Sequence, residues 1–169
     1  LIVSPEEKTG YFVEGERWHS DLSCTTAPPK ASHLYAKVLP EIGGDTMFVS
    51  GYAIFESLSK PMQNFLESLH AEHIGANYRR SYQAKDDGPK AVHPVVTTHP
   101  ETGRKSVFVN PIFTTRIVEL RDDESEALLN VIFQKMHQAE FQCRVRWQLG
   151  TLTMWDNRCT FHRALNDYL

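Results

Sequence analysis

The sequence is poor in cysteine, and its cysteines are not spaced for disulfide bonding or for a metal cluster. Its 169 residues include only Cys24, Cys143 and Cys159, and no two of them form a CxxC spacing. An odd number of scattered cysteines is typical of free thiols in a reducing compartment rather than of a secreted disulfide framework. We therefore expect a cytoplasmic protein.

Long apolar runs and an excess of one charge are also missing. No stretch approaches the roughly 18 consecutive apolar residues that a membrane-spanning helix needs, and the net charge is -3. A weakly negative chain gives no electrostatic basis for binding nucleic acid or an anionic membrane surface, so we expect neither as a partner. The hydrophobic content of 41% is ordinary for a globular protein, and the length suits a single domain.

Short β-prone segments separated by turn residues make up most of the chain. Alternating polar and apolar residues predict strands at 11–13, 17–23, 32–39, 46–49, 92–98, 106–109, 141–149 and 152–155. Apolar residues at helical spacing predict helices over 52–58, 59–69 and 122–137, whereas 78–90 has the composition of a loop. The pattern indicates a mainly β protein with helical insertions, either a β-sandwich or a jelly-roll-type barrel.

The three expected helices have recognisable first residues. Ser50 is expected to cap the first helix, and Ser59 followed by Pro61 to begin the second. Either Asp122 or Asp123 is expected to cap the third. The buried face of that third helix should be lined by Leu128, Val131, Ile132 and Met136.

The stretch Trp18-His19-Ser20-Asp21 carries the clearest chemical signal. His19 and Asp21 are two residues apart, and on a strand such residues point to the same face. An imidazole and a carboxylate side by side are two of the three ligands in the 2-His-1-carboxylate set that holds non-haem Fe(II). His162, near the end of the chain, is the best candidate for the third. A polar strand face is the alternative explanation, because a His-x-Asp triplet often arises by chance.

Six blocks of sequence, running through nearly the whole chain, carry a more specific signal. They are WHSD at 18–21, GGDT at 43–46, HPVV at 93–96, FVN at 108–110, FTTRI at 113–117 and WDNRCTFH at 155–162. In composition and order they resemble the TauD/TfdA family of Fe(II)- and 2-oxoglutarate-dependent dioxygenases, and within it most closely the taurine dioxygenases. No single block is specific, but the set is.

The resemblance implies a fold, a metal and a cosubstrate. The fold is a double-stranded β-helix, or jelly roll, in a single domain over residues 1–169. His19, Asp21 and His162 are implied to bind Fe(II), with 2-oxoglutarate as cosubstrate and O2 as oxidant. Family members are often homodimers or homotetramers, and the implied partner is a small acidic molecule.

The same resemblance assigns roles to other residues, each with a structural alternative. Thr46 is implied to contact 2-oxoglutarate, although β propensity alone explains a threonine at a strand start. Phe113 is implied to line the substrate pocket, and core packing is the alternative. Arg116 is suited either to an anion or to a structural ion pair, and Trp155 either to a position near the iron or to a plain core role.

The match departs from the family pattern in ways that suggest a longer enzyme. The arginine that pairs with the far carboxylate of 2-oxoglutarate in the family follows the distal histidine by more residues than the chain contains, and neither Arg158 nor Arg163 matches it. The segment before His19 and the segment between Tyr78 and His93 are both shorter than in the family. We therefore expect N-terminal, lid and C-terminal segments beyond the printed chain.

The expected reaction is hydroxylation of a small organic sulfonate such as taurine, with release of sulfite, succinate and CO2. Gly15 and Cys24 occupy positions where taurine dioxygenase has an asparagine and a phenylalanine, which favours a different or larger acid. A relative that acts on alkyl sulfates or aryloxyalkanoates is therefore an alternative. Two further alternatives are a catalytically silent jelly-roll binding protein and a zinc hydrolase with the same ligands, although no general base is evident for the latter.

Overall fold

The computed structural model of the protein describes residues 17–75 and 88–168, and over these residues it is mainly β with few helices. The elements in chain order are β1 (Ala31–Tyr35), β2 (Thr46–Ser50), α1 (Gly51–Glu56), α2 (Lys60–Leu66), β3 (His70–Ile74), β4 (Lys90–Pro94), β5 (Val96–Thr98), β6 (Lys105–Val107), β7 (Thr114–Ile117), α4 (Asp122–Lys135), the 3-10 turn η2 (Ala139–Phe141), β8 (Gln142–Val145), β9 (Leu152–Asp156) and β10 (Thr160–Ala164).

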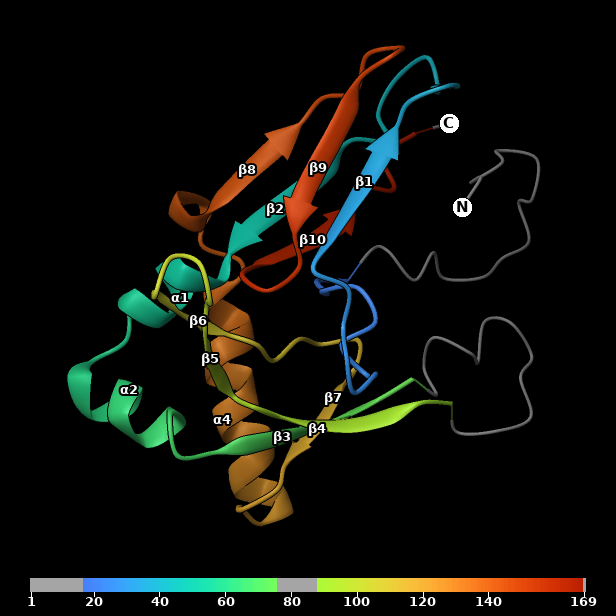
Figure 1. The fold of residues 1–169 in the computed structure, drawn as a ribbon. Helices are drawn as coiled ribbons and strands as arrows, with labels where there is room; N and C mark the ends of the chain where they lie inside the picture. Colours follow the sequence, from blue (N-terminus) through green and yellow to red (C-terminus); the bar gives the residue numbers. More distant parts are fainter. Residues whose placement is uncertain (1–16, 76–87, 169) are drawn as a thin grey trace.

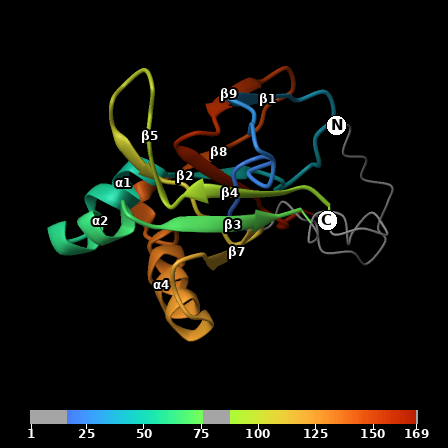
Figure 2. The same ribbon diagram turned by 60° about the horizontal axis from the view of Figure 1, so that its bottom comes forward.

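The strands form small antiparallel sheets at two ends of the molecule (Figure 1). One end holds the sheet β10-β2-β8 and the pair β1-β9, and the other holds β4-β3-β7. The hairpin β5-β6 lies between them beside α1, and α4 packs against β7, as the turned view in Figure 2 also shows. Every strand pairing in this part of the chain is antiparallel, which agrees with the turn-rich sequence.

The first two helices begin where the sequence predicts. The Ser50 hydroxyl accepts a hydrogen bond from the Ala53 amide at 3.2 Å and so caps α1. Ser59 precedes α2, and Pro61 stands in the first turn, where its missing amide hydrogen is not needed. For α4 the predicted cap, Asp122 or Asp123, was one or two residues late: the N-cap is Arg121, and its amide donates to the Glu124 carboxylate at 3.1 Å.

The long helix α4 buries a narrower stripe than its sequence suggests. Ser125, Leu128, Leu129 and Ile132 are buried, followed by Met136 just after the helix. Val131 is 47% exposed, so its expected place on the buried face was wrong. At 100° per residue Val131 lies about 120° from the centre of the stripe. The buried residues join the main core, whose other members include Trp18, Val49, Ile54, Leu66, Ala71, Val107, Ile117 and Phe161.

Several strand predictions were incomplete. The expected strand 92–98 is divided into β4, which pairs with β3, and β5, which pairs with β6. Only 142–145 of the expected strand 141–149 pairs with a neighbour, and Leu149 is 75% exposed. Strands β3, β7 and β10 were not predicted, because their polar residues hide the β pattern: Glu72 and His73 in β3 are both buried. The expected strand 11–13 and most of the expected loop 78–90 lie outside the described residues.

None of the helices in the described ranges 17–75 and 88–168 is long and apolar enough to cross a membrane.

Candidate metal centre

His19, Asp21 and His162 come together although they stand at opposite ends of the sequence. The His19 amide donates to the His162 carbonyl at 3.0 Å and the His162 amide to the His19 carbonyl at 2.8 Å, which makes an isolated antiparallel bridge. The ring centroids are 4.2 Å apart. Asp21 Oδ1 lies 3.7 Å from His19 Nε2 and 3.6 Å from His162 Nε2. One donor atom from each residue lies within 4.8 Å of the other two.

The strand predicted over 17–23 is not present, and a turn replaces its second half. His19 alone makes the bridge, and the chain then turns through Leu22, which has a φ of 50°. That left-handed conformation is uncommon for a residue other than glycine. The Leu22 carbonyl accepts from the Thr25 amide at 3.0 Å, which closes the turn. His19 and Asp21 therefore lie together at the point where a single bridge residue is followed by a turn, and not within a regular strand.

The two histidines present the form of the ring that a metal ion requires. His19 Nδ1 is 2.9 Å from the Arg17 carbonyl, and a carbonyl only accepts, so Nδ1 carries the hydrogen and Nε2 keeps its lone pair. Burial lowers the pKa of His19, and burial together with the neighbouring His19 lowers the pKa of His162 to about 3. Both rings are therefore neutral near pH 7, as metal ligation demands.

The carboxylate of Asp21 is held from behind by a polar network. Its Oδ2 accepts from the Ser32 hydroxyl at 2.5 Å, and Ser32 in turn accepts from Asn157 Nδ2 at 2.8 Å. Asn157 Oδ1 accepts from Trp155 Nε1 at 3.0 Å and from the Asp21 amide at 3.4 Å. Ser20 adds a bond from its hydroxyl to the Asn157 carbonyl at 2.6 Å. Sequence reasoning missed Ser20, Ser32 and Asn157, because neutral side chains at scattered positions give no spacing signal.

Thr46 lies on the strand beside the one that carries His162. In the β10-β2 pairing Phe48 is opposite His162, and Thr46 is two residues from Phe48, so the three share one face. Thr46 Oγ1 accepts from Trp147 Nε1 at 3.1 Å, which leaves the hydroxyl hydrogen available to donate. The structure thus brings Thr46 to the same side of β2 as the triad.

The other residues singled out in the sequence have mixed positions. Phe113 is buried at 2% exposure and packs with Cys24 and Ile112 in a small apolar cluster. The ring centroid of Trp155 is 4.7 Å from that of His162, so this indole packs beside the triad. Arg116 Nε lies 3.5 Å from Glu72 Oε1, which is the ion-pair alternative considered for it. Gly15 lies outside the described residues.

The two arginines near the distal histidine have other partners. Arg158 makes an ion pair with Asp156 and lies 3.3 Å from Glu101. The guanidinium of Arg163 lies 5.1 Å from the centre of the Trp18 ring, a cation–π arrangement. Both arginines thus have partners within the described part of the chain.

A second group of possible metal ligands is formed by His99, Asp156 and Cys159. The amides of Glu101 and Thr102 both donate to His99 Nδ1, at 3.3 and 3.2 Å, so the ring hydrogen must be on Nε2. That Nε2 donates to Asp156 Oδ2 at 3.1 Å. Both ring nitrogens of His99 are thus occupied, and the group has the character of a structural hydrogen-bonded cluster.

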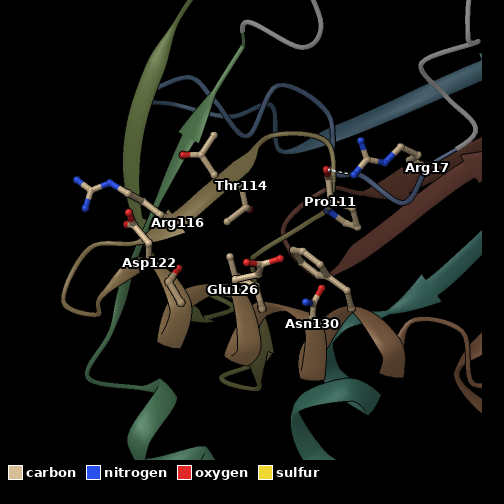
Figure 3. Close-up of a pocket in the computed structure, with 11 residues that line it drawn as sticks. Arg17, Pro111, Thr114, Arg116, Asp122, Glu126 and Asn130 are labelled. Carbon is tan, nitrogen blue, oxygen red and sulfur yellow. Dashed lines mark hydrogen bonds between the residues drawn. The ribbon is translucent and has the colours of Figure 1, made fainter.

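A cavity of about 410 Å³ lies between β7, α4 and the chain around Pro111 (Figure 3). Arg17 reaches over it and donates to the Pro111 carbonyl at 2.7 Å. Arg17 and Arg116 line it together with Asp122 and Glu126, so its charges are mixed. None of His19, Asp21 and His162 lines it, and the balanced charge favours no class of ligand.

The site is a 2-His-1-carboxylate arrangement on a mainly β scaffold, the type of site used by non-haem iron oxygenases. The family described as "Taurine catabolism dioxygenase TauD, TfdA family" matches residues 3–168. The chain therefore belongs to the TauD/TfdA family.

Relatives within this family have several substrates in their names. The chain is 40% identical over 158 residues to a Schizosaccharomyces pombe protein, covering 90% of the chain and 40% of that relative. It is 36% identical to the alpha-ketoglutarate-dependent sulfonate dioxygenase of Saccharomyces cerevisiae, covering 89% and 38%. It is also 34% identical to an alkylsulfatase of Acinetobacter baylyi, covering 89% and 52%. The chain thus spans about two fifths to one half of the length of these relatives.

Solved structures of similar fold include metal-bound and taurine-related enzymes. A taurine dioxygenase from Burkholderia xenovorans is 32% identical with a TM-score of 0.81, covering 95% of the chain and 56% of that structure. The crystal structure of AAD-2 in complex with Mn(II) and N-oxalylglycine is 31% identical with a TM-score of 0.84, covering 92% and 63%.

Proposed function

We propose that the protein is an Fe(II)- and 2-oxoglutarate-dependent dioxygenase that hydroxylates a small organic sulfonate such as taurine. The observation that carries this proposal is the convergence of His19, Asp21 and His162, each of which offers one donor atom within 4.8 Å of the other two. These are the donor types that non-haem Fe(II) prefers. The neutral state of both imidazoles supports the assignment, because a protonated ring does not bind a metal ion.

In this proposal each residue of the site has a defined task. His19, Asp21 and His162 hold the iron, which supplies the oxidative decarboxylation of 2-oxoglutarate and the oxidation of a substrate C–H bond. Thr46 donates its free hydroxyl hydrogen to 2-oxoglutarate, while the Trp147 indole fixes the position of its oxygen. The bulky rings of Phe48 and Trp155, beside His162, exclude water from the site.

The substrate assignment rests on the names of relatives and on the sequence resemblance. A sulfonate dioxygenase and a taurine dioxygenase are among the similar proteins. Hydroxylation of the carbon next to the sulfonate would give an unstable product that releases sulfite and leaves an aldehyde. Phe113, in its apolar cluster with Cys24, is proposed to line the substrate pocket.

A related substrate class is the second candidate. The alkylsulfatase of Acinetobacter baylyi and the 2,4-dichlorophenoxyacetate dioxygenase of Cupriavidus pinatubonensis are 34% and 36% identical to the chain. The small side chain of Cys24, at a position where the sequence comparison has phenylalanine, favours an acid larger than taurine. An alkyl sulfate would release sulfate, and an aryloxyalkanoate would release a phenol, so the products distinguish the classes.

Further parts of the proposal concern the whole molecule. We propose that the antiparallel sheets complete a jelly roll in a single dioxygenase domain, and that N-terminal, lid and C-terminal segments of a longer enzyme, including the cosubstrate arginine, lie beyond residues 1–169. A cytoplasmic location agrees with the free thiols of Cys143 and Cys159. A homodimer or homotetramer is proposed from the family resemblance, and sedimentation of the full-length protein measures it.

The deciding experiment measures succinate made by the full-length protein with Fe(II), 2-oxoglutarate, ascorbate and O2, with and without each candidate acid. Taurine-dependent succinate together with sulfite supports the proposal in full. Succinate that depends on an alkyl sulfate or an aryloxyalkanoate keeps the reaction and changes the substrate. A protein that binds iron but makes no succinate with any acid is the catalytically silent binding protein, and this result overturns the proposal.

A further inference from the structure

The hydrogen bonds behind Asp21 run in one direction only. The Trp155 indole has a donor and no acceptor, so the Asn157 atom that faces it must be the amide oxygen. The Asn157 amide nitrogen therefore points at Ser32, and a nitrogen that donates leaves the Ser32 hydroxyl to accept. The one hydroxyl hydrogen of Ser32 is then free to be donated to Asp21 Oδ2, at 2.5 Å.

This direction gives the two oxygens of the Asp21 carboxylate different tasks. Oδ2 is occupied by Ser32, whereas Oδ1 lies 3.7 Å from His19 Nε2 and 3.6 Å from His162 Nε2. A carboxylate that is free to rotate about its last bond exchanges its two oxygens. The short bond from Ser32 opposes that rotation, since it would have to be broken.

Asn157 contacts both residues of the Ser32–Asp21 hydrogen bond. Its side chain contacts Ser32 on β1 and the Asp21 amide in the turn, and its backbone carbonyl accepts from Ser20 at 2.6 Å. The residue is 1% exposed, so water does not compete for these contacts. Asn157 therefore fixes the distance between the turn that carries Asp21 and the strand that carries Ser32.

We propose that Ser32 and Asn157 are positioning residues that keep Asp21 a one-oxygen ligand, with Oδ1 toward the metal and Oδ2 withheld. This inference rests on the proposed function, since it needs a metal ion at the triad. The consequence is that Asp21 occupies a single coordination position, which leaves more of the metal open to cosubstrate and O2. The Ser32 hydroxyl also draws off part of the charge of Asp21 and so tunes its strength as a ligand.

The test is Mn(II) affinity of the metal-free full-length protein, measured by calorimetry for wild type, Ser32→Ala, Ser32→Thr and Ser57→Ala. Ser32→Ala is expected to weaken Mn(II) binding about 10- to 100-fold, as loss of a group that orients a ligand does elsewhere. Ser32→Thr keeps the hydroxyl and is expected to restore most of the affinity. Ser57→Ala removes a comparable hydroxyl bond, to the Ile54 carbonyl at 2.8 Å, far from the triad, and should leave affinity unchanged.

Urea denaturation of the metal-free variants separates positioning from folding. The inference is supported if Ser32→Ala binds Mn(II) more weakly but keeps the wild-type unfolding midpoint, and if Ser32→Thr restores the Mn(II) affinity. Equal Mn(II) affinity of wild type and Ser32→Ala overturns it while leaving the metal site intact. A wild-type protein that binds no Mn(II) removes the triad assignment itself, and with it the proposed function.

As a second variant, Asn157→Ser shortens the side chain and removes its bridge to Ser32. The expected result is a loss of Mn(II) affinity at least as large as that of Ser32→Ala, because both Ser32 and the Asp21 amide lose a partner. Combining the two changes should add little to either one, since they interrupt the same chain of bonds. Additive losses would show that Asn157 acts independently of Ser32 and would contradict the proposal that Asn157 positions Asp21 through Ser32.

Discussion

Two clusters of histidine and aspartate lie on adjacent parts of this protein. They differ in whether their hydrogen bonds leave lone pairs of nitrogen and oxygen available to a metal ion. Asp156 and Asn157 are neighbours in the chain, but Asp156 bonds to His99 and Arg158, whereas Asn157 supports Asp21 through Ser32. In the first cluster both nitrogens of the histidine are occupied. In the second, two histidines and one carboxylate each offer a donor atom within 4.8 Å of the other two.

With the triad as the proposed metal site, the comparison indicates that ligand-type residues close together are not sufficient for metal binding. What decides is the direction of each hydrogen bond around them. The carbonyl behind His19 directs its lone pair toward the triad, whereas the amides behind His99 direct its lone pair away from Asp156. The guanidinium of Arg158 also neutralises Asp156 and keeps the pKa of that carboxyl well below its usual range.

The largest expected difference between the two clusters is in the Mn(II) affinity of their histidine variants. His19→Ala removes one of three donors and is expected to weaken Mn(II) binding by more than about 100-fold, beyond the range for supporting groups. The matched change His99→Ala should leave Mn(II) affinity within about twofold, because His99 offers no lone pair to a metal. Calorimetric titration of both variants checks this, and a large loss in His99→Ala would reverse the roles of the two clusters.

His73 sharpens the comparison, because it is a buried histidine whose described partners are hydroxyls rather than a carboxylate. Its Nδ1 lies 3.0 Å from the Ser23 hydroxyl, and burial lowers its pKa from 6.5 to about 3. Between those pH values the unfolded chain binds a proton that the folded chain does not, so stability is present above about pH 6.5 and falls as pH decreases. The contribution of this residue approaches about 1.4 kcal/mol per pH unit.

The corresponding measurement is urea unfolding of the metal-free protein at several pH values between 7 and about 4. His73→Gln keeps a polar side chain but cannot take up a proton in this range, so its stability should fall less steeply with acidification than that of wild type. Identical slopes for the two proteins would show that His73 is protonated in the folded state.

A moderate effect is expected from the structural cluster. Asp156→Asn removes the charge that binds Arg158 and His99, and hydrogen bonds to charged groups contribute about 1.5–3 kcal/mol. The free energy of unfolding should therefore fall by about that amount, with Mn(II) affinity unchanged. Glu56→Gln is the control, since its ion pair with Arg104 is exposed and should matter little. Urea denaturation and Mn(II) titration of the same samples test both statements.

The smallest expected effect concerns the cosubstrate. Thr46→Val removes the hydroxyl proposed to donate to 2-oxoglutarate, and loss of one hydrogen bond of about 1–1.5 kcal/mol weakens binding about tenfold. Thr46→Ser keeps the hydroxyl and should bind normally. The measurement is anaerobic titration of 2-oxoglutarate into the Mn(II)-loaded protein. If Thr46→Ser binds as weakly as Thr46→Val, the methyl group rather than the hydroxyl is responsible.

The three triad residues could be identified from the sequence, because a His-x-Asp pair and a distant histidine are recognisable without knowledge of the fold between them. The sequence did not reveal how they meet. The strand expected around His19 ends there, since a single bridge to His162 is followed by the turn at Leu22. The Ser50 cap of α1 and the start of α2 after Ser59 were predicted correctly, because helix starts depend on residues only a few positions apart.

The features that could not be predicted from the sequence depend on contacts between residues that are distant in the chain. Strand β3 contains buried Glu72 and His73. Their partners, on β4, β7 and the turn, are distant in the sequence and offset the cost of burying these polar groups only once the chain has folded. Asn157 and Ser32 carry no charge and no characteristic spacing, so their support of Asp21 is visible only when β1 and β9 are paired.

The bridge between His19 and His162 also has a consequence for how the protein is made. A ribosome releases His19 and Asp21 early, but the residue that completes the set follows only after almost every described strand has been synthesised. The backbone bonds that align the two histidines require β10, which pairs with β2 and places His162 opposite His19. A nascent or truncated chain that lacks β10 therefore presents two ligands instead of three, and the full set of three exists only after β10 has been made and has paired with β2.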